Sequence, residues 1–301
     1  MTGGPLRVIW HPSSLEHDAG RGHPESPERI RAVRRELAEG PLAARVTWVE
    51  APAADRAALE RVHTREHLDH LTAVAKRGGG RLDPDTVMNA ASLRAAVHAA
   101  GAAVAAAASA LAGVPAFALV RPPGHHAPAD HAMGFCLLNN VVVAARAALK
   151  AQGLERVLIV DWDVHHGNGT QALVERDARI RYVSLHQWPL YPGTGRADEH
   201  GVGNVFNVPM PPGRPREEYV TALDAAVARA TEGWAPQLLL ISAGFDAMAG
   251  DPLAGFTLEP EDYATWVSRW RGLGAPIASV LEGGYVPVRI ARGAAAHLAA
   301  L

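Results

Sequence analysis

Residues 157–169 read VLIVDWDVHHGNG, and this stretch decides the fold class. Its first four residues are all apolar, which is typical of a strand covered by helices on both faces of a parallel sheet. Mainly polar residues and glycines follow at once, from Asp161 to Gly169. Ligands of open α/β sheets bind beyond the carboxyl ends of the strands. The stretch therefore predicts a buried strand that delivers carboxylates and imidazoles to a site.

Short apolar runs and helix-length segments alternate along the rest of the chain. Strands are expected at 7–10, 46–49, 116–120, 157–160, 181–185, 237–242 and 276–281. The first helix is expected to begin at Ser26, whose side chain caps it, to take Pro27 into its first turn and to end at Gly40. Further helices are expected at 56–62, 66–76, 92–111, 139–150, 217–232 and 261–272. This alternation predicts an α/β fold, a single three-layer domain over residues 1–301 with a mostly parallel central sheet flanked by helices.

The composition excludes several classes of protein. The 301 residues are 48% apolar and 20% charged, with a net charge of −2 and a pI near 6.7. Disorder is excluded for the bulk of the chain, and no basic field is available for nucleic acid or an anionic membrane. The N-terminus lacks a signal-peptide pattern, and the alanine-rich segment 95–112 is expected to be a buried helix. We therefore expect a cytoplasmic protein of bacterial type.

Any metal must be held by histidine or carboxylates, because Cys136 is the only cysteine. In an extended segment Asp161, Asp163 and His165 point to one side. Asp246, which follows another apolar run, is the candidate third ligand beside Asp163 and His165. Three such ligands with an open position are typical of catalytic zinc, and they also suit Fe²⁺ or Co²⁺. The alternatives are a hydrogen-bonded polar turn for the segment and a helix N-cap for Asp246.

Two adjacent histidines, His125 and His126, follow a Pro-Pro-Gly sequence. The prolines and glycine break the strand, so both rings can reach one cavity, where imidazole suits acid/base work. Asp161 or Asn168 is available to orient the second ring nitrogens. Tyr285, after two glycines, is placed to donate to a developing oxyanion. The alternatives are a solvated histidine pair and a surface tyrosine.

Taken together and in order, these motifs resemble the zinc-dependent histone deacetylase family of the arginase–deacetylase fold. The chain is most similar to the class II-like bacterial members, the histone deacetylase-like amidohydrolases. The resemblance covers nearly the whole chain. It lies in the segments 22–29 (GHPESPER), 121–127 (RPPGHHA), 134–136 (GFC), 161–169 (DWDVHHGNG), 191–195 (YPGTG), 246–252 (DAMAGDP) and 282–285 (EGGY).

The resemblance implies a role for each matching residue. The three candidate metal ligands match the family's zinc ligands. The tandem histidines match its catalytic pair, with His126 as general base and acid. Asp161 matches the partner of His125. Asn168 stands where class I members have an aspartate, which leaves His126 less stabilised as a cation. Tyr285 matches the tyrosine that polarises the amide carbonyl.

The resemblance also implies a second ion and a substrate tunnel. A structural potassium ion is implied, held by Asp161, Asp163, His165, Ser184 and Leu185. Phe135 and Tyr191 match the aromatic walls of an acyl-lysine tunnel, and the Gly134 carbonyl is expected to accept the substrate amide. Leu253 stands where polyamine-selective relatives place an acidic gatekeeper. Val286 replaces the asparagine that commonly follows the tyrosine, so the resemblance does not determine the orientation of the tyrosine.

The implied function is a metal-dependent amide hydrolase that removes acetyl or other acyl groups from the ε-amine of lysine in proteins or peptides. In it, a metal activates water, histidine acts as general base and acid, and tyrosine stabilises the oxyanion. One alternative is an amidohydrolase for acetylpolyamines, other small acylated amines or longer acyl-lysines on the same site. A silent acyl-lysine-binding module and a two-metal, arginase-like hydrolase are further alternatives. A homo-oligomer is compatible with the sequence, whereas nucleic acid and membrane partners are not expected.

Overall fold

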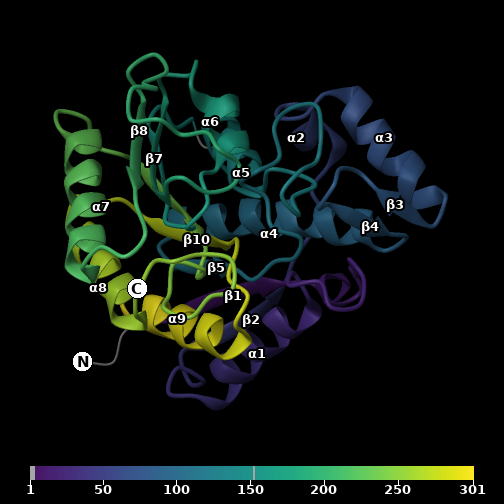
Figure 1. Cartoon of the computed structure of the whole chain (residues 1–301), viewed down its shortest axis with the longest axis horizontal. Helices are drawn as coiled ribbons and strands as arrows, with labels where there is room; N and C mark the ends of the chain where they lie inside the picture. Colours follow the sequence, from purple (N-terminus) through teal and green to yellow (C-terminus); the bar gives the residue numbers. More distant parts are fainter. Residues whose placement is uncertain (1–3, 152) are drawn as a thin grey trace.

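The computed structural model describes residues 4–151 and 153–301 and is built on one eight-stranded sheet with helices on both faces (Figure 1). The strand order is β2-β1-β5-β10-β9-β6-β7-β8, and every neighbouring pair is parallel. The strands are β1 (Leu6–Trp10), β2 (Val46–Glu50), β5 (Ala116–Ala118), β6 (Val157–Asp161), β7 (Ile180–Gln187), β8 (Val205–Met210), β9 (Leu238–Ala243) and β10 (Ile277–Leu281). A separate antiparallel pair is formed by β3 (Gly79–Arg81) and β4 (Val87–Asn89). The predicted α/β class is confirmed.

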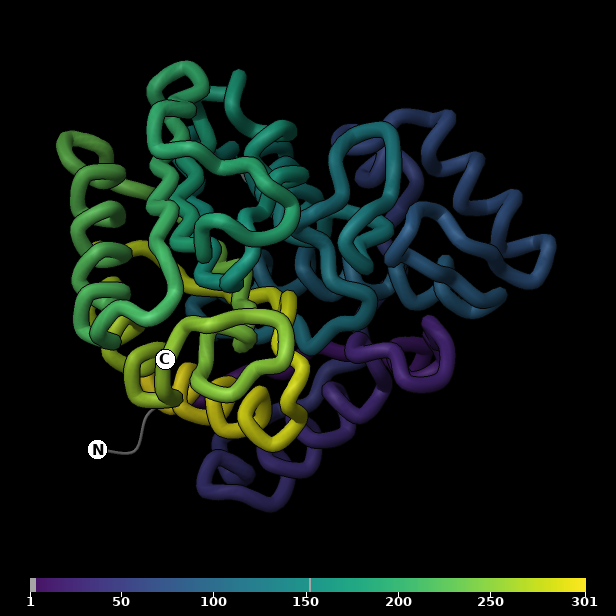
Figure 2. Tube along the Cα trace, viewed as in Figure 1, coloured from purple at the N-terminus to yellow at the C-terminus, as the bar shows by residue number. Residues whose placement is uncertain are grey.

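Helices cover both faces of the sheet. They are α1 (Pro27–Glu39), α2 (Arg56–Glu60), α3 (Arg65–Lys76), α4 (Ser92–Leu111), α5 (Asn140–Ala151), α6 (Asn168–Val174), α7 (Arg216–Thr231), α8 (Pro260–Trp270) and α9 (Pro287–Ala299). On one face α4 contacts β1, β5 and β10, and α5 contacts β6 and β9. On the other, α1, α9 and α8 form a row that continues into α7 (Figure 1). Figure 2 shows α1, in purple, beside α9, in yellow, although they stand at opposite ends of the chain.

The alanine-rich helix α4 lies inside the fold. By length and composition it is the one helix of residues 4–151 and 153–301 that could cross a membrane, but 61% of its apolar window is buried. Small alanine side chains let it approach the sheet and α5 closely, and Ala100, Ala102, Ala103 and Ala106 are fully buried. The prediction of a buried helix for this segment is confirmed.

Some elements differ from the prediction. The sequence analysis did not predict β8, α6, α9 or the β3–β4 pair. The edge strand β8 contains Pro209 and is only partly buried, so it lacks the continuous apolar run of the central strands. Ser26 does occupy the N-cap of α1, with Pro27 in the first turn, but its side chain makes no capping hydrogen bond. Instead, the Ser26 carbonyl accepts the Arg29 N–H (3.2 Å).

The connection from β5 to β6 creates the crevice that holds the site. The chain leaves β5, passes through α5 and enters β6, and β10 and β9 lie between these two strands in the sheet. Loops that leave neighbouring strands in different directions open a crevice at the carboxyl edge. The loops after β5, β6, β9 and β10 therefore meet there.

Candidate active site

Three ligating side chains converge beyond the carboxyl ends of β6 and β9. Asp163 and His165 follow β6, and Asp246 follows β9. Each offers one ligand atom, and these atoms lie within 4.8 Å of one another. All three residues are buried, and backbone donors fix the carboxylates. Gly283 N–H donates to Asp163 Oδ2 (2.7 Å), and Val164 N–H donates to Asp246 Oδ1 (2.9 Å).

The charges of this triad favour a cation at its centre. Nδ1 of His165 lies 3.1 Å from Asp163 Oδ1 and 3.2 Å from Asp246 Oδ2. Burial alone would lower the pKa of His165, but the hydrogen bond to Asp163 and the negative charges of both carboxylates outweigh burial and raise that pKa to about 10. Asp246 Oδ2 is buried and makes no hydrogen bond within the described residues. Two carboxylates, one of which has this unpartnered oxygen, and one imidazole fit a divalent metal that keeps an open coordination position.

Glycine at position 283 is required by this convergence. A Cβ atom there would overlap Oδ2 of Asp246 and Oδ2 of Asp163. The glycine pair before Tyr285 therefore lets the loop after β10 approach the two carboxylates closely and donate a backbone N–H to one of them.

The tandem histidines lie beside the triad and have unlike partners. Nδ1 of His125 donates to Asp161 Oδ2 (3.1 Å), which also accepts the Tyr182 hydroxyl (3.0 Å). Nδ1 of His126 lies 2.8 Å from Asn168 Oδ1, and the two imidazole ring centroids are 4.0 Å apart. Both rings are buried. Each of the two partners suggested by the sequence therefore binds one ring.

These partners give the two imidazoles opposite pKa shifts. Burial opposes the charged form of His125, but the Asp163 and Asp161 carboxylates outweigh it and raise its pKa to about 10. Burial, followed by the charge of His125, lowers the pKa of His126 well below its ordinary value. With Asn168 Oδ1 accepting from Nδ1–H, the Nε2 atom of His126 is left as a proton acceptor.

A pocket of about 180 Å³ leads to this cluster. It is lined by Asp85, His126, Gly134, Phe135, His165, Leu190, Tyr191, Leu253 and Tyr285. The four residues expected to contact substrate all line it, together with a metal-ligand candidate, a histidine and the tyrosine. The sequence analysis missed Asp85 and Leu190. The turn sequence Asp-Pro-Asp-Thr at 83–86 signals a loop at this point, but nothing in it indicates a pocket.

Asp85 and its neighbour Thr86 hold one wall of the pocket. Asp85 Oδ1 accepts the Gly134 N–H (3.2 Å), and Thr86 Oγ1 accepts the Phe135 N–H (3.0 Å). Phe135 has φ of 67°, the one positive φ of a non-glycine residue in the described part of the chain. A bulky residue in this region costs on the order of 1–3 kcal/mol and persists only where its surroundings fix it. The aromatic wall is therefore held in place by its backbone.

Tyr285 reaches the pocket from the loop after β10. Its ring lies edge-on to Phe135, with centroids 6.0 Å apart, and the Arg29 guanidinium lies 5.4 Å from its centroid. Burial raises the pKa of Tyr285 well above its ordinary value, so the hydroxyl stays a donor. The sequence analysis gave no role to two carboxylates, Asp251 and Glu282, that bind backbone N–H groups beside the site. Asp251 Oδ2 accepts the Tyr285 N–H (2.8 Å). Glu282 Oε2 accepts the Gly124 N–H (2.7 Å), just before the tandem histidines.

The residues expected to hold potassium are adjacent. Asp161 at the end of β6 pairs in register with Ser184 of β7, and Leu185 follows Ser184 in the same strand. The Asp163 N–H donates to Asp161 Oδ1 (3.1 Å), and this hydrogen bond forms a turn at the end of β6.

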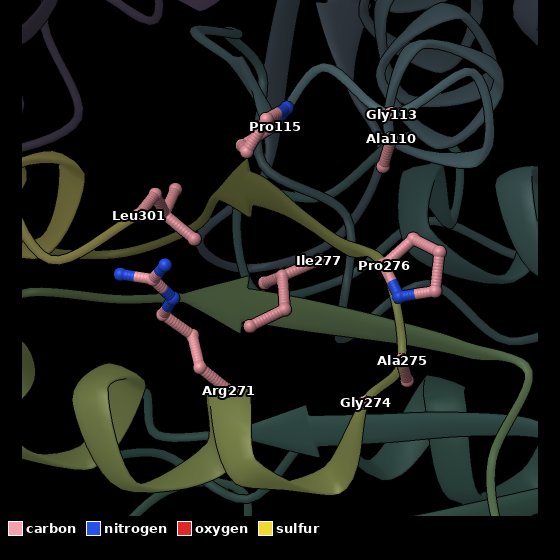
Figure 3. A pocket seen from close by; sticks show the side chains of 9 residues that line it. All are labelled: Ala110, Gly113, Pro115, Arg271, Gly274, Ala275, Pro276, Ile277 and Leu301. Carbon is pink, nitrogen blue, oxygen red and sulfur yellow. The ribbon is translucent and has the colours of Figure 1, made fainter. Parts of the chain in front are cut away.

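Residues 4–151 and 153–301 hold one group of three ligating side chains, the triad of Asp163, His165 and Asp246. A second such group, which a two-metal centre would need, is absent from the described residues. A hollow of about 340 Å³ lies at the opposite edge of the sheet, before β5 and β10 (Figure 3). Its lining includes Pro115, Ile277 and Leu301, with Arg271 as its one charged side chain. Among the described residues, the candidate metal triad therefore lies at the carboxyl edge and not beside this hollow.

Comparisons with known proteins agree with this arrangement. Residues 23–301 match the histone deacetylase domain family. A protein named "Probable deacetylase" from Methanothermobacter thermautotrophicus is 40% identical over 301 residues, covering 98% of this chain and 90% of the relative. A histone deacetylase-like amidohydrolase from Pseudomonas aeruginosa is 40% identical over 283 residues, covering 90% and 74%. The crystal structure of the HDA15 HD domain superposes with a TM-score of 0.93 at 39% identity, covering 98% of this chain and 87% of that one. The chain therefore belongs to the histone deacetylase family and is a deacetylase or amidohydrolase of that family.

Proposed function

We propose that this protein is a zinc-dependent hydrolase that removes acetyl or other acyl groups from the ε-amine of lysine. The observation that carries the proposal is a narrow pocket, walled by Phe135 and Tyr191, that ends on a buried metal-binding triad beside His126. An acylated lysine side chain is a thin, neutral rod, so it can be desolvated between two aromatic rings at little cost. A free lysine would have to bring its charged ammonium group between the same two rings, which costs much more free energy of desolvation.

Asp163, His165 and Asp246 would hold the zinc ion, with Fe²⁺ or Co²⁺ as alternatives. When bound, the metal would polarise the acyl carbonyl and lower the pKa of water. The segment 161–165, with Ser184 and Leu185, would hold the structural potassium ion that the family resemblance implies, and the adjacency of Asp161 and Ser184 supports this.

The remaining steps belong to the side chains of the pocket. His126, neutral because its pKa is lowered, accepts a proton from the attacking water at Nε2 and later gives it to the leaving ε-amine. Asn168 holds the tautomer that this requires. The buried Tyr285 hydroxyl donates to the oxygen on which negative charge develops. The Gly134 carbonyl accepts the substrate amide N–H beside Phe135.

A second substrate class is an acetylpolyamine or another small acylated amine. Asp85 lines the pocket and is only partly buried, so its carboxylate is available to the second amine of such a molecule. Leu253 and Leu190 present apolar side chains to the same pocket and favour acyl-lysine, including longer acyl chains.

The test is a substrate screen on the purified chain, stripped with a chelator and reloaded with Zn²⁺, Fe²⁺ or Co²⁺. Turnover of an acetyl-lysine peptide, longer acyl-lysine peptides and acetylspermidine is followed by release of the free acid. We expect acetyl-lysine or a longer acyl-lysine to give the highest kcat/KM, with activity lost on chelation and restored by metal. Peptide binding without release under every metal would contradict the proposal and identify an acyl-lysine-binding module.

A further inference from the structure

We infer that Asp251 is a positioning residue that fixes Tyr285 and Leu253 in the pocket by binding the backbone of both. This inference rests on the proposed function, because it assigns Asp251 an effect on the tyrosine that polarises the substrate. Asp251 does not line the pocket, so it acts through its neighbours.

The geometry is a carboxylate that bridges two loops. Asp251 lies in the loop after β9 and is 8% exposed. Its Oδ2 atom accepts the Tyr285 N–H (2.8 Å) from the loop after β10, and its Oδ1 atom accepts the Leu253 N–H (3.0 Å) from its own loop. Each oxygen thus satisfies a backbone donor of a residue that lines the pocket. Loss of the carboxylate frees both at once.

The loop that carries Tyr285 depends on such contacts. Successive backbone groups are bound by buried charged side chains: Gly283 N–H by Asp163, Gly284 O by Arg29 Nε (2.6 Å), and Tyr285 N–H by Asp251. Gly284 has φ of 114°, a conformation that offers little intrinsic resistance to change in glycine.

The residue after the tyrosine adds no polar anchor of its own. Val286 has an apolar side chain and is the N-cap of α9 without a side-chain capping bond. Among the described contacts, the Tyr285 N–H donates to Asp251 alone, so the direction of the tyrosine depends on that carboxylate. The proposed role of Asp251 therefore concerns the orientation of Tyr285, which valine at position 286 leaves undetermined in the sequence.

The expected effect follows from the sensitivity of catalysis to placement. A displacement of about 1 Å in a group that stabilises the transition state costs on the order of 100-fold in rate. We expect Asp251→Ala to lower kcat about 10- to 100-fold with metal content unchanged. Asp251→Asn keeps one acceptor oxygen but turns an amide NH₂ toward the other N–H. We therefore expect its kcat to lie between those of the wild type and Asp251→Ala.

The test is a double-mutant cycle with Tyr285→Phe. If Asp251 acts through the tyrosine hydroxyl, Asp251→Ala lowers kcat in the wild-type background but changes it less than about threefold in the Tyr285→Phe background. Asp262→Ala is the matched control. Asp262 is also buried and accepts a backbone N–H, that of Glu259 (2.8 Å), at the start of α8, and we expect its loss to leave kcat unchanged.

Amide hydrogen exchange at Tyr285 gives a readout that does not need activity. We expect Asp251→Ala to lose protection there and Asp251→Asn to lose less of it, while Asp262→Ala keeps it. Equal losses of kcat in both backgrounds, or unchanged protection at Tyr285, would overturn the inference. A wild-type protein that hydrolyses no substrate would refute the proposed function instead, and the exchange experiment would still decide whether Asp251 holds the tyrosine.

Discussion

Asn168 Oδ1 lies 2.8 Å from Nδ1 of His126, so a neutral amide orients the second of the tandem histidines. The first histidine, by contrast, is paired with the Asp161 carboxylate at 3.1 Å. The amide fixes the tautomer without adding negative charge, and burial with the neighbouring His125 charge keeps the pKa of His126 low. The pair thus combines a ring that tends to be charged with one that tends to be neutral. A proton acceptor next to a metal site requires the neutral form.

Replacement of Asn168 by aspartate changes the charge at this contact and little else. A carboxylate within hydrogen-bonding distance raises the pKa of His126 above that in the wild-type protein, because it stabilises the charged imidazole. Protonated His126 cannot accept a proton, so the acidic limb of the kcat/KM profile moves to higher pH. We expect this shift in profiles recorded between pH 5 and 9. Asn168→Ala, the control, lowers the rate without moving the limb upward, and an unmoved limb in Asn168→Asp would contradict the role of His126 as base.

Loss of one carboxylate ligand removes the metal. Asp246→Ala leaves Asp163 and His165, two ligands in place of three, in a site whose charge is also reduced. We expect metal content, measured by elemental analysis after dialysis, to fall from about one equivalent to near zero, with activity lost in parallel. Asp262→Ala, a buried aspartate outside the site, serves as the control that retains metal. Full metal occupancy in Asp246→Ala would show that Asp246 is not a ligand.

The sequence predicted the buried central strands and the metal-ligand candidates that follow them, because both depend on residue types that stand close together in the chain. The apolar run before Asp161 is buried along its whole length, as its composition indicates. The approach of Asp246 to Asp163 follows from parallel strands, whose carboxyl ends share one edge of the sheet. These predictions needed only the residue types and the alternation of strand and helix.

The features that were missed depend on contacts between distant loops. Asp251 and Tyr285 are 34 positions apart, and no spacing or periodicity connects them. Asp85 reaches the pocket because the β3–β4 turn packs on the loop that carries Gly134, 49 positions away. The helix α6 begins at Asn168 inside the polar motif itself, where residues that serve the site mask a helical pattern. Such contacts become visible only when the sheet has set the loops beside one another.

A buried ion network below the site makes a prediction for stability. Glu25 accepts hydrogen bonds from Arg29 Nη1 (2.9 Å) and Arg121 Nη2 (2.8 Å), and all three side chains are fully buried. Glu25→Gln leaves two buried guanidinium groups without their counter-charge. We expect the free energy of unfolding at pH 7, from denaturant titration, to fall by about 3–5 kcal/mol. Glu28→Gln, which removes an exposed partner of Arg31, is the control with a much smaller effect.

The pH dependence of this stabilisation has a definite sign. Burial opposes ionisation of Glu25, but the Arg121 charge and the hydrogen bonds to the carboxylate outweigh it, so the pKa lies well below its ordinary value. A depressed pKa in the folded state gives stability that is complete above about pH 4.3, the ordinary pKa of glutamate, and is lost as pH falls below it. The difference between wild type and Glu25→Gln is therefore expected to shrink on acidification. A constant difference from pH 7 to pH 3 would contradict the ionised state of Glu25.

Leu253 offers a direct test of substrate selection. Its side chain lines the pocket beside Tyr191 and Tyr285, so a glutamate at this position would bring a carboxylate to the path of the substrate. A charge-assisted hydrogen bond contributes about 1.5–3 kcal/mol, equivalent to at least tenfold in kcat/KM. We expect Leu253→Glu to raise the ratio of kcat/KM for acetylspermidine to that for an acetyl-lysine peptide by about tenfold or more.

Charge and shape are separated at this position by Leu253→Gln, which has nearly the same volume as the glutamate variant but no charge. If the carboxylate attracts the second amine of the polyamine, Leu253→Gln leaves the ratio near that of wild type, and added salt reduces the gain in Leu253→Glu. An equal rise in both variants would instead mean that any polar side chain opens the pocket to polyamines. In that case the preference for acyl-lysine would arise from the apolar surface that Leu253 and Leu190 share, and Leu190→Gln should weaken it as well.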